Sequence, residues 1–124
     1  MARVLIIEDD DQLLGLLERI LVREGHEVIC TSDGVEGLAA LKGAEVDLII
    51  TDIVMPEKEG LETIRELKQA HPDKPIIAIS GGGRISPDRY LHVSEMLGAD
   101  RAFRKPVPRK DMLDAVRQLL SVES

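Results

Sequence analysis

Short apolar runs alternate along the chain with longer segments in which apolar residues recur every three or four positions. Runs of a few residues rich in β-branched side chains predict β-strands, and their nearly continuous apolar character predicts central strands that are covered on both faces. Five such runs are present, at positions 3–7, 27–31, 46–51, 75–80 and 101–104.

The intervening segments have the spacing of amphipathic helices. The apolar stripe of the first extends from Leu13 to near Gly25. Asp10 and Asp11 precede this stripe and are expected to be the acidic residues of the helix's first turn. A Ser-Pro-Asp sequence at 86–88 is typical of a helix start, and the last helix is expected to begin after Pro108. The apolar stripes of the five predicted helices cover positions 13–21, 35–41, 61–67, 86–97 and 112–120. Five strands that alternate with five helices predict an α/β fold with a parallel sheet.

Composition narrows the function classes. The 124 residues are expected to form one domain, 1–124. The net charge of −7 argues against direct binding to nucleic acid or to an anionic membrane, because both are negatively charged. No apolar run reaches membrane-spanning length and no signal-peptide pattern opens the chain, so we expect a cytoplasmic protein. Cys30 is the only cysteine, and its apolar surroundings in the sequence predict a buried, inert thiol.

Charged and polar side chains follow the predicted strands where each strand ends. Glu8 and Asp9 follow the first, Asp52 ends the third, Ser80 ends the fourth and Lys105 follows the fifth. Ligands of open α/β sheets bind beyond the carboxyl ends of the strands, so these groups are expected to meet at one edge. Clustered carboxylates repel one another unless a cation neutralises them, and Mg²⁺, with Mn²⁺ as the alternative, suits such oxygen ligands. A carboxylate beside Mg²⁺ can act as a nucleophile toward a phosphoryl group.

Four motifs, in this order and spacing, carry a family resemblance over essentially the whole chain: VLIIEDD at 4–10, DLIITDIVMPEKEG at 47–60, IIAISG at 76–81 and GADRAFRKP at 98–106. The chain resembles the receiver domain of response regulators in bacterial two-component signalling, the group that includes chemotaxis regulators. The resemblance implies a flavodoxin-like, doubly wound five-stranded sheet in the order 2-1-3-4-5 with five helices. The first and last helices would cover one face and the other three the opposite face.

The resemblance also implies roles for the strand-end residues. Asp52 matches the phosphoacceptor and Asp9 the direct Mg²⁺ ligand. Glu8 matches the acidic neighbour that reaches the metal through water, and the backbone carbonyl of Val54 matches a main-chain metal ligand. These four residues form the expected metal site.

Two further positions match the family's phosphate contacts. Ser80 matches the switch hydroxyl and Lys105 the lysine that pairs with the phosphate, and the Lys105–Pro106 bond is expected to be cis. The implied function is phosphoryl transfer to Asp52 from a sensor histidine kinase or a histidine phosphotransfer protein, which switches binding to an effector protein or an attached output domain. The domain would be a signalling module, not a conventional enzyme, and a monomer or weak dimer.

One departure from the family pattern leaves an alternative open. The family usually has an aromatic residue three positions before the lysine, whereas this chain has Ala102, and strand alternation is expected to turn Phe103 to the opposite face. A phosphorylation-independent interaction module with the same fold therefore remains the second interpretation. An aspartate-nucleophile phosphohydrolase is disfavoured, because such enzymes need a second acid where this chain has Val54.

Overall fold

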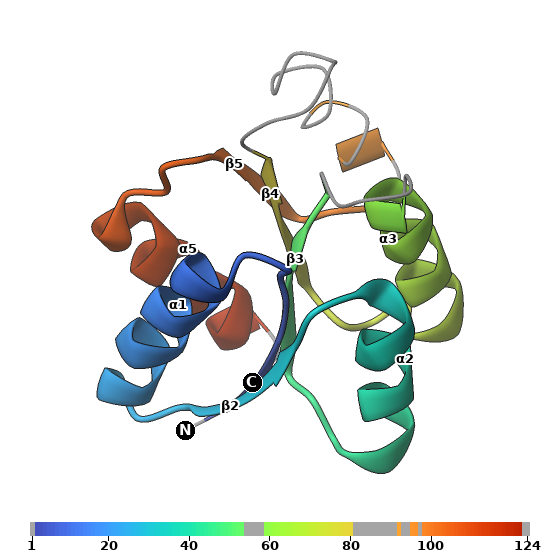
Figure 1. Ribbon diagram of the computed structural model, residues 1–124, viewed down its shortest axis with the longest axis horizontal. Helices are drawn as coiled ribbons and strands as arrows, with labels where there is room; N and C mark the ends of the chain where they lie inside the picture. Colours follow the sequence, from blue (N-terminus) through green and yellow to red (C-terminus); the bar gives the residue numbers. More distant parts are fainter. Residues whose placement is uncertain (1, 54–58, 81–91, 93–94, 97, 123–124) are drawn as a thin grey trace.

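The computed structural model describes residues 2–53, 59–80, 92, 95–96 and 98–122. Its centre is one parallel sheet of five strands in the order β2-β1-β3-β4-β5, which confirms the predicted topology (Figure 1). The strands are β1 (Arg3–Ile7), β2 (Glu27–Thr31), β3 (Leu48–Asp52), β4 (Ile76–Ser80) and β5 (Arg101–Arg104).

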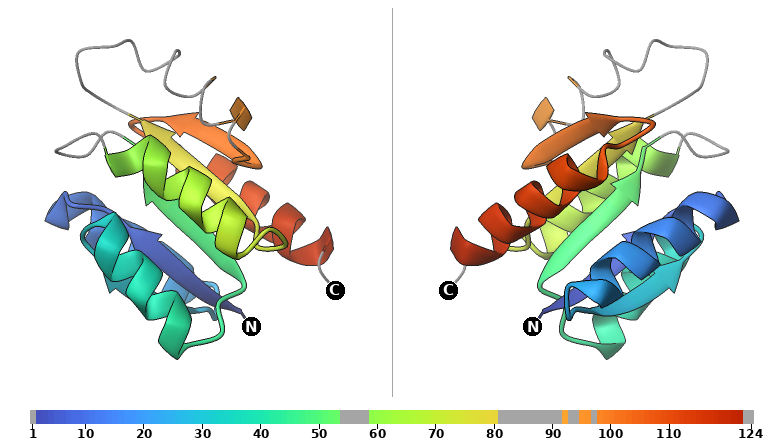
Figure 2. Two further views of the ribbon diagram at one scale, coloured as in Figure 1. Left: turned by 90° about the vertical axis from the view of Figure 1, so that its right-hand side faces the viewer. Right: turned by 90° about the vertical axis from the view of Figure 1, so that its left-hand side faces the viewer.

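Helices cover both faces of the sheet (Figure 2). In the described part of the chain they are α1 (Asp11–Arg23), α2 (Gly34–Gly43), α3 (Glu59–Ala70) and α5 (Arg109–Val122). The last of these begins directly after Pro108, as predicted. The helix expected over 86–97 falls largely outside the described residues; His92, Glu95 and Met96, which are described, are helical.

Side-chain alternation along the strands divides the interior into two aliphatic cores. In β1, Val4 and Ile6 pack with residues of α1 and α5, whereas Leu5 and Ile7 pack with residues of α2 and α3. Every residue of β3 and β4 is buried, because helices cover these central strands on both sides. The predicted assignment of the first and last helices to one face, and of the second and third to the other, is therefore confirmed.

The prediction that Cys30 is buried is wrong. Cys30 is exposed, because β2 lies at the edge of the sheet and pairs only with β1. Partial burial of the thiol, together with the nearby carboxylate of Glu18, raises the pKa of Cys30 to about 11. The thiol therefore stays protonated at neutral pH. Because the thiolate is the reactive form of cysteine, Cys30 is unreactive at this pH.

Aspartate side chains begin two of the helices. Asp10 caps α1 by accepting hydrogen bonds from the backbone N–H groups of Gln12 and Leu13, while Asp11 lies in the first turn. Asp33 caps α2 by accepting from the N–H of Glu36 at 2.8 Å. Both caps satisfy backbone donors that would otherwise have no partner within the helix.

The cap of α2 gives a stability prediction. Replacing Asp33 with alanine removes the acceptor and should lower the free energy of unfolding by about 1 kcal/mol, measured by urea denaturation. Asp33→Asn keeps an acceptor oxygen and should lose less. Equal losses in the two variants would show that the side-chain hydrogen bond to Glu36 is not what stabilises this helix start.

Candidate functional site

The carboxyl ends of neighbouring strands bring the predicted site residues together. Glu8 follows β1, Asp52 is the last residue of β3, Ser80 is the last of β4, and Lys105 follows β5. Three of these side chains are almost inaccessible: Glu8 is 1%, Asp52 2% and Ser80 0% exposed. Asp9, by contrast, is exposed. Val54 lies outside the described residues.

Lys105 joins the two buried acids. Its Nζ lies 3.1 Å from Oε1 of Glu8 and 3.1 Å from Oδ2 of Asp52. The second carboxylate oxygen of Glu8 accepts a hydrogen bond from the backbone N–H of Asp10 at 3.0 Å. The backbone N–H of Lys105 donates to the carbonyl oxygen of Ser80 at 2.8 Å, which extends the pairing of β4 and β5 as far as the lysine. The lysine is therefore held in place by the sheet, and its ammonium group lies between two carboxylates.

Burial dominates the electrostatics of Glu8. Desolvation of the carboxylate raises the pKa of Glu8 to about 7; the Asp10 N–H and Lys105 oppose this rise, while the nearby Asp52 adds to it. Burial alone would lower the pKa of Lys105, but the carboxylates of Asp52 and Glu8 outweigh it, so that pKa lies above its ordinary value. The lysine is thus firmly cationic, whereas the proton on Glu8 is lost near neutral pH.

The acidic residues have the geometry of a small metal site. Glu8, Asp9 and Asp52 each offer a carboxylate oxygen, and these oxygens lie within 4.8 Å of one another. Hard oxygen ligands around an open, partly exposed position match the preference of Mg²⁺, which keeps several waters when bound by proteins. The buried Oε1 of Glu8 accepts no hydrogen bond from the described residues and faces the ammonium group of Lys105. This donor set fits a divalent cation.

Ser80 contributes a hydroxyl group beside the acids. Its Oγ is buried and has no hydrogen-bond partner among the described residues. Buried hydroxyl groups in folded proteins are nearly always paired, so an unpaired one at a strand end is a donor that a ligand can use.

The side chains of β5 have the orientations predicted from strand alternation. Phe103 packs against the core beneath α1 and α5, and Ala102 packs against the core beneath α2 and α3. The described part of the chain therefore has no aromatic side chain on the Ala102 side of β5.

Sequence patterns placed the candidate residues at one edge of the sheet but did not indicate the main contact among them. They assigned Lys105 to a phosphate and Glu8 to a metal through water; they did not indicate that these two side chains form an ion pair with each other. The two residues are far apart in the chain, and no local signal relates them.

Comparison with known proteins agrees with this geometry. A sequence model of the response regulator receiver domain matches residues 4–117. The chain belongs to the response regulator receiver domain family. It is 35% identical over 120 residues to the transcriptional regulatory protein CpxR of Klebsiella pneumoniae, covering 97% of this chain and 50% of CpxR. It is 33% identical over 119 residues to GlrR of Escherichia coli, covering 96% of this chain and 26% of GlrR. This receiver domain thus spans half or less of the length of these two relatives.

Solved structures give the same assignment. A receiver domain protein from Clostridium thermocellum superposes with a TM-score of 0.89 at 28% identity, covering 99% of this chain and 97% of that one. A CheY-like receiver domain protein from Methanospirillum hungatei superposes with a TM-score of 0.87 at 30% identity, covering 98% of this chain and 94% of that one. None of the helices in the described residues of this receiver domain is long and apolar enough to cross a membrane.

Proposed function

We propose that this receiver domain accepts a phosphoryl group on Asp52 in a Mg²⁺-dependent transfer from a phosphohistidine of a sensor kinase or phosphotransfer protein. One observation carries the proposal: Asp52 is a buried carboxylate, 2% exposed, at the end of a central strand, with Lys105 Nζ 3.1 Å away and Glu8 and Asp9 beside it. Burial of a carboxylate destabilises the fold unless the charge is paired. Here the partner is a lysine, which can also stabilise the negative charge of a phosphoryl group during transfer.

The residues divide the chemistry among them. An Oδ atom of Asp52 forms a bond to phosphorus as the bond from phosphorus to the donor imidazole nitrogen breaks, and the electron pair of that bond returns to the imidazole. The ammonium group of Lys105 stabilises negative charge on one phosphoryl oxygen, and the hydroxyl of Ser80 donates a hydrogen bond to another. Asp9, Asp52, the Val54 carbonyl and, through water, Glu8 would hold Mg²⁺, which would neutralise part of the negative charge of the phosphoryl group.

Phosphorylation would also break an existing contact. The pairing of Lys105 with both Glu8 and Asp52 must rearrange when the lysine turns to a phosphoryl oxygen. Because Lys105 directly follows β5, we propose that this rearrangement is what changes the surface presented to an effector protein or an attached output domain. Relatives such as CpxR are transcriptional regulatory proteins about twice as long, so an attached output domain and a cytoplasmic setting are part of the proposal.

The test is intact-mass spectrometry of the purified chain after incubation with Mg²⁺ and acetyl phosphate, a small phosphodonor. We expect the addition of one phosphoryl group, which should be absent when EDTA replaces Mg²⁺. Mass increase that is independent of Mg²⁺ would contradict the proposed metal role. No increase from acetyl phosphate or from a set of phosphorylated histidine phosphotransfer domains would favour the phosphorylation-independent interaction module.

A further inference from the structure

Two hydrogen bonds join the start of β5 to the start of β4. Asp100, which directly precedes β5, donates from its backbone N–H to the carbonyl oxygen of Ile76 at 2.8 Å. Its Oδ2 atom accepts a hydrogen bond from the backbone N–H of the same isoleucine, also at 2.8 Å. These two bonds, the Asp100 clamp, run in opposite directions between one aspartate and the first residue of β4. They therefore fix where the two strands begin relative to each other.

Neighbouring groups hold the Asp100 carboxylate in this position. Nζ of Lys68, on α3, lies 3.5 Å from Oδ2 of Asp100 and donates a hydrogen bond to the carbonyl oxygen of Lys74 at 3.0 Å. Gly98 has a φ of +121°, which side chains disfavour, and a Cβ there would lie 2.6 Å from Cγ of Lys68. Support for the carboxylate thus comes from α3 and from the turns before β4 and β5.

Packing alone specifies the register of β5 less firmly than that of its neighbours. The strand pairs only with β4, at the edge of the sheet, and only its two middle residues, Ala102 and Phe103, are partly buried. Every residue of β3 and of β4 is buried. Because buried side chains are what make a slip of register unfavourable, β5 depends on its hydrogen bonds to β4 more than the central strands do.

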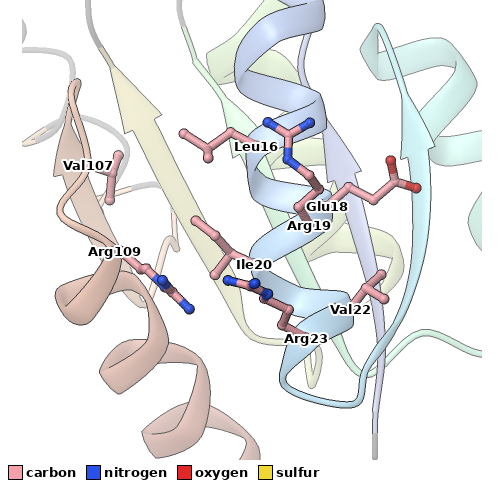
Figure 3. A pocket seen from close by; sticks show the side chains of 8 residues that line it. All are labelled: Leu16, Glu18, Arg19, Ile20, Val22, Arg23, Val107 and Arg109. Atoms are coloured by element: carbon pink, nitrogen blue, oxygen red, sulfur yellow. The ribbon is translucent and has the colours of Figure 1, made fainter.

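The segment that follows β5 borders open space. Val107 and Arg109 line one side of a groove of about 680 Å³, and Leu16 and Ile20 of α1 line the other (Figure 3). This segment therefore constrains Lys105 less than the pairing of β5 with β4 does.

The register of β5 matters for the candidate site because the strand leads into the lysine. The backbone N–H of Lys105 donates to Ser80, the last residue of β4, at 2.8 Å, so the two strands end side by side. Nζ of Lys105 lies 3.1 Å from Glu8 and 3.1 Å from Asp52. A slip of one residue would turn the side chains of β5 to the opposite faces and take the ammonium group away from both acids.

We propose that Asp100 is a positioning residue for phosphoryl transfer, because its clamp sets the register that brings Lys105 beside Asp52. The inference rests on the proposed function and adds to it a residue that touches neither the phosphoryl group nor the metal. Asp100 acts through the lysine, from about 16 Å away along an extended strand. Displacement of a catalytic group by about 1 Å can lower a rate about 100-fold, so loss of the clamp should have a measurable effect.

The same arrangement between β1 and β3 provides a matched control. The N–H of Asp47 donates to the carbonyl oxygen of Arg3 at 2.8 Å, and Oδ2 of Asp47 accepts from the N–H of Arg3 at 2.9 Å. However, β3 pairs with a strand on each side and is wholly buried. Its register therefore does not depend on one clamp, and Asp47→Ala should leave the position of the lysine unchanged.

The first measurement is amide hydrogen exchange, followed by NMR on metal-free protein without a phosphodonor. In Asp100→Ala we expect the N–H of Lys105, which is bonded to Ser80, to exchange at least about 10-fold faster than in wild type. The N–H of Ile53, which donates to the carbonyl oxygen of Ile79 at 2.9 Å, should keep its wild-type rate. A general loss of stability would instead raise both exchange rates by the same factor. Asp47→Ala should leave the Lys105 amide at its wild-type rate.

The second measurement is the rate constant for phosphorylation by acetyl phosphate at saturating Mg²⁺, from intact-mass spectrometry. Asp100→Ala should lower it at least about 10-fold, whereas Asp47→Ala should stay within about 2-fold of wild type. Asp100→Asn keeps an oxygen that can accept from the Ile76 N–H and should restore the rate to within about 3-fold of wild type. Mg²⁺ affinity, from an NMR titration, should be no weaker in any variant, because the acids that would hold the ion follow β1 or end β3.

Separate results would overturn the clamp and the positioning role. Wild-type exchange at Lys105 in Asp100→Ala, or an equal rise at Lys105 and Ile53, would show that the clamp does not hold the lysine. Unchanged phosphorylation despite faster exchange, or equal rate loss in Asp47→Ala, would overturn the role in transfer. If wild type accepts no phosphoryl group from any donor, the proposed function fails and the positioning role with it, whereas exchange at Lys105 still decides the clamp.

Discussion

Replacing Asp52 with asparagine should abolish phosphoryl incorporation from acetyl phosphate. The amide is nearly the same size as the carboxylate, but its oxygen is a poor nucleophile and it brings no negative charge to the metal site. The change leaves the contact between Lys105 and Glu8 in place, since that ion pair joins different atoms. We expect incorporation to fall at least about 100-fold below wild type, measured by intact-mass spectrometry after a fixed incubation.

The matched control is Asp73→Asn. Asp73 is exposed and lies between α3 and β4, at the amino-terminal edge of the sheet, so the same substitution there should leave incorporation at the wild-type level. Undiminished incorporation in Asp52→Asn would show that another side chain is the acceptor, and peptide mapping of the phosphorylated protein would identify it. Loss in both variants would indicate that the assay responds to net charge.

Replacing Glu8 with glutamine should stabilise the metal-free protein above neutral pH. Glu8 has a pKa raised from 4.5 to about 7, mainly by desolvation, so the folded state binds a proton that the unfolded state has already lost. The wild-type free energy of unfolding should therefore fall as pH rises through this window, by about 3 kcal/mol at most. The contribution of protonated Glu8 is fully present below about pH 4.5 and is lost as pH rises through about 7.

Glutamine removes this loss because it never ionises, while its side-chain oxygen can still accept the hydrogen bond from the Asp10 N–H. We expect Glu8→Gln to exceed wild type by about 1–3 kcal/mol at pH 8, and to match it near pH 4, in urea denaturation with EDTA present. Saturating Mg²⁺ at pH 8 should narrow or reverse the difference, because the Glu8 carboxylate of the wild type adds a negative charge beside the ion. Glu66→Gln, at an exposed position of α3, is the control; it keeps Glu8, so its stability should fall with rising pH as that of the wild type does. A wild-type stability that rises between pH 5 and 8 without metal would contradict the assignment of a desolvated Glu8.

Sequence by itself determined the layers of this protein and the edge of the sheet at which the candidate site residues lie. Apolar runs and helical spacing fix which residues face a core, because side-chain direction follows the local backbone period. The same period placed Phe103 and Ala102 on opposite faces of β5, as the structure has them. The acids, Ser80 and Lys105 could be assigned to one edge, because parallel strands end together at the same side of a sheet.

Strand position within the sheet decided what local pattern could not. Cys30 has apolar neighbours in the sequence, yet β2 is an edge strand and leaves the thiol exposed. An apolar run has the same local sequence pattern in an edge strand, which pairs with one neighbour, as in a central strand, which pairs with two. Burial at β2 depends on which strands lie beside it, a property of the assembled sheet.

Tertiary structure alone decided the ion pairs and protonation of the site. Asp52 and Lys105 are separated by 53 residues in the chain, yet their charged atoms are 3.1 Å apart. The raised pKa of Glu8 is likewise a property of neighbours brought from distant segments. The physical reason is one of range: backbone periodicity acts over a few residues, whereas desolvation and charge interactions depend on distances that only the packed sheet and helices set.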